Sequence, residues 1–152
     1  MSDKAVSVEG LRPVTAVGVV CLRGDELLLV RRGNPPRAGE WSIPGGRIEP
    51  GEPAKDAALR ELAEEISVEA ELLGLIDVVD AIFENKAGDL VTRHYVLIDY
   101  VARWVSGEPV AGDDAAEARF FTAAEVMELG LWDETLRIIE AGRIIAMAAK
   151  GA

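Results

Sequence analysis

The chain has 152 residues, the usual size of one domain, and so leaves no room for a second domain of ordinary length. Its composition, 49% hydrophobic and 28% charged, is typical of a globular protein and argues against intrinsic disorder. Sixteen basic against 27 acidic residues give a net charge of −11, whereas a nucleic-acid polymer would require a contiguous basic surface. We expect a single domain over 1–152, with a flexible N-terminal segment at 1–11, and no nucleic-acid partner.

Cysteine content and hydropathy bear on the cellular compartment. Cys21 is the only cysteine, so the chain can form neither an internal disulfide nor a multi-cysteine zinc site. The apolar run over 14–22 is shorter than the roughly 20 residues that span a bilayer, and no small-residue cleavage site follows it. These features favour a reducing, cytoplasmic location without a membrane partner.

Two β-rich runs open the predicted structure. Residues 14–22 and 26–32 predict a pair of central strands joined by a glycine-containing hairpin turn. Turn-forming residues fill the segment 32–40, which predicts a loop, and 41–44 predict a short extended piece. We expect the adjacent Gly45-Gly46 pair to break the chain there.

A change of hydrophobic period predicts a helix over 53–66. Pro53 suits the first turn of a helix, where its missing N–H is not needed. Ala58, Leu62 and Ile66 recur every four residues and therefore lie on one face.

The second half of the chain predicts further strands and two more helices. In chain order we expect strands over 68–84 and 90–105, a loop over 107–114, a short strand near 118–121, a brief helix and a final helix from about Asp133. Thr122 can cap the brief helix because Glu125 follows at the capping-box spacing. This order fits a mixed α/β or α+β sandwich rather than regular βαβ winding.

The acidic residues are concentrated in one region. Residues 45–84 include eleven acidic and three basic side chains and so carry most of the net charge. Because a helix advances about 100° per residue, Glu64 and Glu65 lie within about 60° of Glu61, one on each side. We expect these three carboxylates to share a narrow face with no Lys or Arg directly among them.

Two interpretations of this acidic face remain open on geometry alone. Like charges spaced three or four residues apart cost a helix only about 0.2–0.5 kcal/mol per pair, which a solvated surface tolerates. Alternatively, a hard divalent cation offsets the repulsion, since oxygen-rich clusters suit Mg²⁺, Mn²⁺ or Ca²⁺ rather than Zn²⁺.

A fixed spacing connects these glutamates with residues before and after them. The matching positions are Gly46, five residues, Glu52, seven residues, Arg60-Glu61-Leu62, one residue, Glu64-Glu65, two residues and Val68. This pattern closely resembles the Nudix box, G-x5-E-x7-R-E-U-x-E-E-x-G-U, in which U is a bulky aliphatic residue. Ser67 departs from this pattern because it stands where the box has its second glycine. A glycine at that position would suit a left-handed helix end.

The resemblance implies a fold and a set of roles. The fold would be the Nudix-type α/β/α sandwich with a mixed β-sheet. Glu61, Glu64 and Glu65 would bind catalytic divalent ions, Mg²⁺ or alternatively Mn²⁺, with the Gly45 or Gly46 carbonyl as an extra ligand. Glu61 or a residue outside the box would help deprotonate water, and the pair Glu52 and Arg60 would fix the geometry between loop and helix.

Residues outside the box could contribute to substrate binding. Arg31, Arg32 and Arg37 border the turn-rich loop and could clamp phosphates, although arginines on loops are often simply solvated. Glu117 follows two aspartates in what we expect to be a loop, and in many Nudix proteins such a residue is an additional metal ligand or base.

These features favour Mg²⁺-dependent cleavage of the pyrophosphate bond in a nucleoside diphosphate linked to another moiety. The segment before the box also resembles small bacterial ADP-ribose pyrophosphatase-like proteins, although the proline that marks one ADP-ribose branch is missing. One alternative is a MutT-type nucleoside triphosphate pyrophosphohydrolase, and another is a nucleotide-sensing module without turnover. Nudix proteins of this size are often homodimers.

Overall fold

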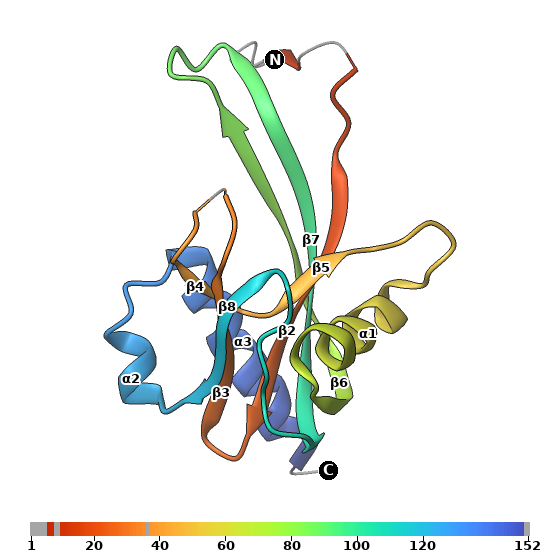
Figure 1. Ribbon diagram of the computed structural model, residues 1–152, viewed down its shortest axis with the longest axis vertical. Helices are drawn as coiled ribbons and strands as arrows, with labels where there is room; N and C mark the ends of the chain where they lie inside the picture. The colour runs from red at the N-terminus through yellow and green to blue at the C-terminus, as the bar shows by residue number, and fades with distance from the viewer. Residues whose placement is uncertain (1–5, 8–9, 36, 151–152) are drawn as a thin grey trace.

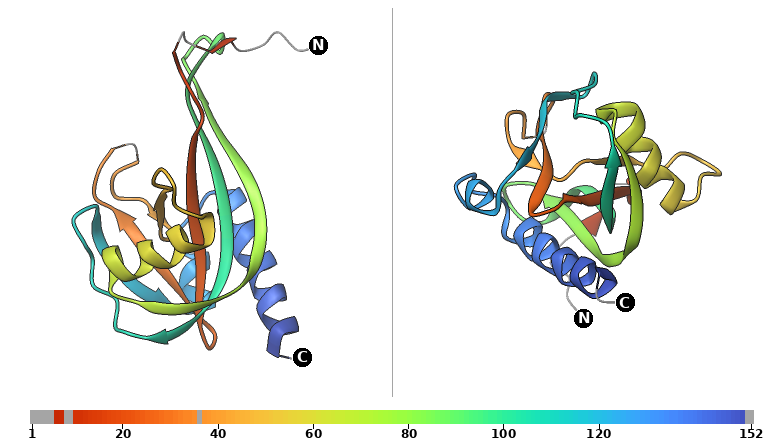
Figure 2. Two further views of the ribbon diagram at one scale, coloured as in Figure 1. Left: turned by 90° about the vertical axis from the view of Figure 1, so that its right-hand side faces the viewer. Right: turned by 90° about the horizontal axis from the view of Figure 1, so that it is seen from below.

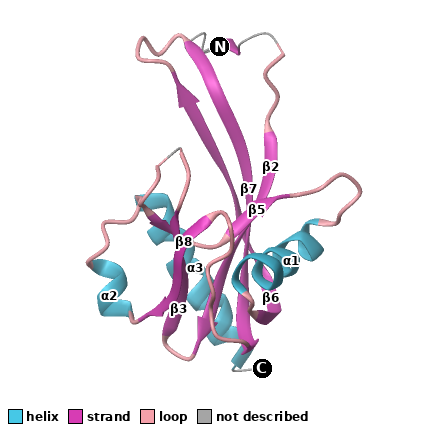
Figure 3. Cartoon of the chain, in the orientation of Figure 1, coloured by secondary structure: helices cyan, strands magenta, loops and turns pink. Residues whose placement is uncertain are grey.

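The computed structural model describes residues 6–7, 10–35 and 37–150, and its elements follow the predicted order (Figures 1 and 3). In chain order they are β1 (Val6–Ser7), β2 (Val14–Arg23), β3 (Glu26–Arg32), β4 (Trp41–Ser42), β5 (Gly45–Arg47), α1 (Ala54–Ile66), β6 (Glu69–Glu84), β7 (Leu90–Ser106), β8 (Ala115–Phe121), α2 (Ala123–Met127) and α3 (Asp133–Lys150). None of the helices in this described part is long and apolar enough to cross a membrane.

The strands form one mixed sheet arranged around β2. This strand runs parallel to β7 and antiparallel to β3 and β5. β6 then pairs with the other edge of β7, while β4 and β8 both pair with β3. The predicted α/β/α architecture with a mixed sheet is therefore confirmed.

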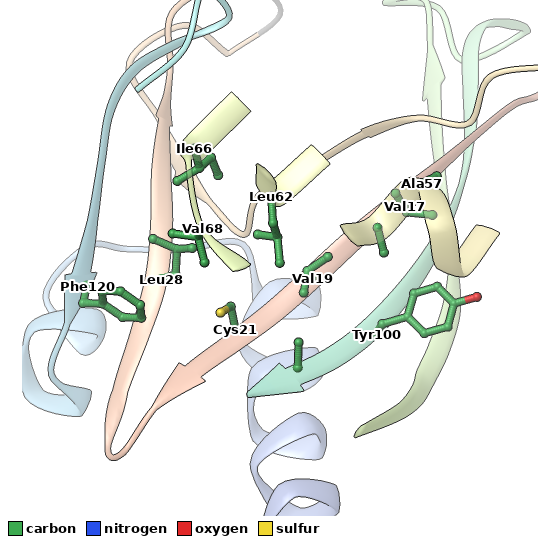
Figure 4. Packing of buried hydrophobic residues seen from close by; sticks show 12 residues of the cluster. Val17, Val19, Cys21, Leu28, Ala57, Leu62, Ile66, Val68, Tyr100 and Phe120 are labelled. Atoms are coloured by element: carbon green, nitrogen blue, oxygen red, sulfur yellow. The ribbon is translucent and has the colours of Figure 1, made fainter. Parts of the chain in front are cut away.

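Alternating side chains of β2 supply two separate cores. Val17, Val19 and Cys21 face α1, and Figure 4 shows them packed with helix residues such as Leu62. Val20 and Leu22 belong to the core that includes α3. The two helices thus cover opposite faces of the sheet (Figure 2), which explains why β2 is almost continuously apolar.

The outer half of the β6–β7 hairpin projects beyond the body of the molecule together with the start of β2 (Figures 1 and 2). β1 pairs in parallel with this arm, placing Val6 opposite Leu90. The flexible segment predicted over 1–11 includes these two β1 residues. The rest of that prediction falls largely on residues 1–5 and 8–9, which lie outside the described residues.

Two local expectations were wrong. Gly45-Gly46 does not interrupt the chain, because these residues begin β5 and pair antiparallel with Gly18 and Val17 of β2. The short strand expected near 118–121 begins earlier, as β8 extends over Ala115–Phe121 along β3. In both cases the missing signal was the neighbouring strand, which local composition does not reveal.

The capping box of Thr122 and Glu125 is confirmed by hydrogen bonds in both directions.

The end of α1 depends on Ser67 adopting a left-handed conformation. Ser67 has φ 64° and ψ 33°, and its backbone N–H donates to the Ala63 carbonyl. The next residue, Val68, is fully buried and donates its N–H to Leu62, so the turn cannot easily relax. An L-residue in this conformation costs about 1–2 kcal/mol, as the departure from the Nudix box predicted.

We expect Ser67→Gly to raise the free energy of unfolding by about 1 kcal/mol, since glycine relieves the strain but has greater freedom in the unfolded chain. Urea unfolding would measure the difference. The matched control is Ala63→Gly in the same helix, which should lower stability by about 0.5–1 kcal/mol. Destabilisation by both glycines would contradict the assignment of strain to Ser67.

Candidate active site

A charge-assisted pair joins the loop before α1 to the helix itself. Arg60 donates from Nε to Glu52 Oε2 at 2.6 Å and from Nη2 to Oε1 at 3.0 Å, a bidentate arrangement. Nη2 also donates to the carbonyl of Arg47 at 3.1 Å, while Glu52 accepts from the Glu49 backbone N–H at 3.1 Å. The hydrogen bonds from Arg60 hold the pKa of Glu52 below its ordinary value. This geometry agrees with a positioning role for the pair.

The same guanidinium reaches the acidic face, contrary to our expectation that no basic group lies among those carboxylates. Arg60 Nη1 donates to Glu61 Oε1 at 3.0 Å and lies 3.6 Å from Glu64 Oε2. Helical angles describe where side chains leave the backbone, whereas the long arginine side chain bends back along the helix. Arg60 therefore compensates part of the negative charge.

Glu61 lies in a tight space beneath β5. Its side chain is only 12% exposed, and a Cβ atom added to Gly46 would overlap its carboxylate. Burial is the largest cause of a raised Glu61 pKa, Arg60 opposes it, and the neighbouring charges of Glu65 and Glu64 add to it. The box glycine at position 46 is thus required by the close approach of Glu61.

Glu65 occupies the most enclosed position of the three. Its Oε2 is the only solvent-inaccessible side-chain nitrogen or oxygen without a hydrogen bond among the described residues. The backbone of Gly112 passes directly over this side chain, and the same loop is attached to the helix end by a hydrogen bond from the Val110 N–H to the Ile66 carbonyl. A buried acceptor without a donor is costly unless something absent from the polypeptide completes it.

Glu64 differs from its two neighbours because its side chain is 64% exposed. Over the described ranges, no three acidic or histidine side chains converge as a ready-made metal-binding group. The three glutamates therefore share one helix face, as predicted, but point into different surroundings. Gly45, the predicted backbone ligand, is exposed on β5 and lines the same cleft as Glu61 and Glu65.

This cleft has a volume of about 1170 Å³, enough for a nucleotide derivative. The predicted phosphate-binding residues Arg31, Arg32 and Arg37 all line it. Arg37 has φ 62° and lies 3.8 Å from the Glu40 carboxylate, which places its guanidinium on the loop side of the cleft. Carboxylates and guanidiniums thus line one continuous space.

Glu117 is not where the sequence suggested. It lies within β8 rather than in a loop, opposite Arg31 in the register with β3. Its carboxylate is 3.6 Å from the guanidiniums of both Arg31 and Arg119. The lining of the cleft includes Asp114 and Ala115 but not Glu117. On this geometry Glu117 contacts the predicted substrate-binding arginine rather than the cleft itself.

Asp99 is a lining residue that the sequence did not single out. It lies on β7, is 4% exposed and is the only buried charged residue in the described part of the chain. Burial raises its pKa to about 6; the charge of Asp77 adds to this shift and that of Arg137 opposes it. The alternation of residues along 90–105 could have placed Asp99 on an inward face, but not shown what lies opposite.

The titration of the buried Asp99 carboxyl group should be visible in the pH dependence of stability. Because its pKa rises from 3.8 to about 6 on folding, the folded state binds more protons between these values, and stability falls as pH rises through this window. We expect the free energy of unfolding of Asp99→Asn to exceed that of the wild type by about 2–3 kcal/mol above pH 7. Near pH 4 the two values should match. Urea unfolding across pH 4–8 measures this gap, and a constant gap would contradict the assignment.

Comparison with known proteins agrees with the fold and the box. The NUDIX domain family model matches residues 12–141. The chain is 31% identical over 126 residues to an ADP-ribose pyrophosphatase of Methanocaldococcus jannaschii, covering 83% of this chain and 72% of the relative. It is 33% identical over 122 residues to a putative 8-oxo-dGTP diphosphatase of Mycobacterium tuberculosis. That match covers 78% of this chain and 79% of the relative.

Among solved structures, a MutT NUDIX hydrolase from Burkholderia pseudomallei superposes with a TM-score of 0.71 at 28% identity. The superposition covers 86% of this chain and 98% of that one. The family model, the relatives and the fold all indicate the same family. The chain therefore belongs to the Nudix family and is a Nudix hydrolase.

Proposed function

We propose that this protein hydrolyses the pyrophosphate bond of a nucleoside diphosphate linked to another moiety, such as ADP-ribose, with Mg²⁺ as the divalent ion. The observation that carries the proposal is the unpaired, inaccessible Oε2 of Glu65 beside the largely buried Glu61 in a cleft also lined by arginines. The similarity to a relative named ADP-ribose pyrophosphatase supports this substrate class.

The donor set fits a hard divalent cation. Carboxylate oxygens of Glu61, Glu64 and Glu65, with the carbonyl of Gly45, are the oxygen ligands that Mg²⁺ or Mn²⁺ prefers. The orphaned oxygen of Glu65 is what such a site requires, because a cation supplies the partner that the polypeptide lacks. When bound, the ion neutralises phosphate oxygens and lowers the pKa of coordinated water.

The remaining roles belong to side chains of this chain. Arg31, Arg32 and Arg37 would bind and orient the diphosphate from the loop side of the cleft. Glu61 would accept a proton from water, since its carboxylate lies in the cleft beneath Gly46. Water oxygen then bonds to phosphorus, the anhydride P–O bond breaks, and each product carries one phosphate.

A second substrate class has specific support. The relative from Mycobacterium tuberculosis is named a putative 8-oxo-dGTP diphosphatase, which corresponds to the triphosphate alternative. The same carboxylates and arginines would serve either substrate, so the products must discriminate between them. Single-domain organisation, cytoplasmic location and a homodimer remain predictions.

We expect hydrolysis of ADP-ribose to AMP and ribose 5-phosphate in the presence of Mg²⁺, and little turnover in EDTA. A panel of diphosphate derivatives and nucleoside triphosphates, with products separated by ion-exchange chromatography, tests this. Inorganic pyrophosphate released from triphosphates, with diphosphate derivatives left intact, would establish the triphosphate activity instead.

Glu65→Gln should reduce kcat by roughly 100-fold or more while leaving the protein folded, since the amide keeps the shape but loses the charge that holds the cation. Glu71→Gln is the matched control, because Glu71 is a half-exposed carboxylate on β6 paired with Arg103. Initial rates and thermal unfolding with Mg²⁺ would be measured for both. Full activity of Glu65→Gln would refute its assignment as a metal ligand.

A further inference from the structure

The cleft contains a second unpaired carboxylate, on the face of the sheet opposite α1. Asp99 belongs to the alternating residues of β7 that include Leu97, packed against the α3 core, whereas Glu61 and Glu65 come from α1 on the other face. None of the hydrogen bonds among the described residues involves the Asp99 carboxylate. The role of Asp99 is therefore not explained by the predicted metal-binding group.

The groups facing Asp99 do not neutralise it. Asp77, opposite in the β6–β7 register, is also acidic. Arg137 of α3 is already paired with Asp77 at 3.1 Å and with Glu134 at 2.8 Å. The polypeptide thus buries the Asp99 carboxylate without providing an ion pair of its own, which destabilises the folded protein.

The position of this carboxylate is fixed by close packing. Gly18 lies opposite Asp99 in the parallel β2–β7 register, and a Cβ atom added to Gly18 would overlap Asp99 Oδ1. The same added atom would lie 2.9 Å from Ile43 Cδ1, so the side chains on both sides leave little space. The carboxylate is held in place and available to hydrogen-bond donors that enter the cleft.

The cleft also offers aromatic side chains to the part of a nucleotide that is not phosphate. Trp41, Phe83, Tyr95 and Trp132 line the same cleft. Phe83 and Tyr95 pack edge to face with their ring centroids 6.4 Å apart. Pockets that combine aromatic side chains with a few fixed polar groups commonly bind planar or hydroxyl-bearing groups.

We infer that Asp99 is a specificity-determining residue that accepts hydrogen bonds from two adjacent donors on the non-phosphate part of the substrate. Two sources offer such a pair: the neighbouring imino and amino N–H groups of a guanine base, and the 2′- and 3′-hydroxyls of a ribose. Adenine offers no adjacent pair of donors on its pairing edge. The inference rests on the proposed function only in taking this cleft as the substrate site.

Equilibrium binding separates the two sources without requiring turnover. Isothermal titration calorimetry in Mg²⁺ would compare GMP with AMP, and ribose 5-phosphate with 2-deoxyribose 5-phosphate, on the full chain. We expect the wild type to prefer the two-donor member of one pair by about tenfold or more, and Asp99→Asn to abolish that preference. The pair affected identifies the group that Asp99 contacts.

Two further variants make the test specific. Asp80→Asn removes the same charge from a 57% exposed side chain of β6 outside the cleft lining and should keep the preference. Gly18→Ala should displace the Asp99 carboxylate and lose the preference even though Asp99 is retained. Equal loss in Asp80→Asn, or no difference between Asp99→Asn and the wild type on any of the four ligands, would overturn the inference.

The outcome is distinguishable from failure of the proposed function. If Asp99 controls ligand preference but no diphosphate derivative is hydrolysed, the proposed activity fails and the inference stands. If ADP-ribose is hydrolysed and Asp99→Asn binds all four ligands like the wild type, the inference fails and the proposed activity stands.

Discussion

The burial of β2 on both faces is the constraint on which the rest of the structure depends. A strand that pairs with β3, β5 and β7 and supplies both cores cannot shift without moving every element packed against it. Its register with β5 sets Gly46 over Glu61, and its register with β7 sets Gly18 over Asp99. One strand therefore positions carboxylates on both sides of the sheet.

Electrostatics at the site follow from how unequally the acidic groups are compensated. Arg60 is shared among several carboxylates, but its bidentate contact goes to Glu52 rather than to the predicted metal ligands. This arrangement keeps the loop and the helix together while leaving Glu65 without a partner. Because the chain carries a net charge of −11, its overall electrostatic field favours a bound cation at this site.

The predictable parts of this protein were those encoded locally. The helix ending at Ile66 was evident because its apolar residues repeat every four positions, and the capping box of Thr122 because both partners lie within one turn. The strand status of Gly45-Gly46, the position of Glu117 in β8 and the burial of Asp99 were not predicted, since each depends on a strand distant in sequence. Arg60 was misplaced for a different reason: helical angles ignore the reach of a long side chain.

The two kinds of unpaired carboxylate have different physical consequences. Glu65 is adjacent to other acidic groups on α1, so a small, doubly charged ion can satisfy several of them together. Asp99 lies buried beside Gly18, with Asp77 opposite it and no hydrogen bond of its own among the described residues, so a neutral donor satisfies it without requiring a cation. A substrate whose phosphates bring the cation to one end of the cleft, and whose paired donors reach Asp99 at the other, would relieve both costs, which links affinity for the whole molecule to the two ends being present together.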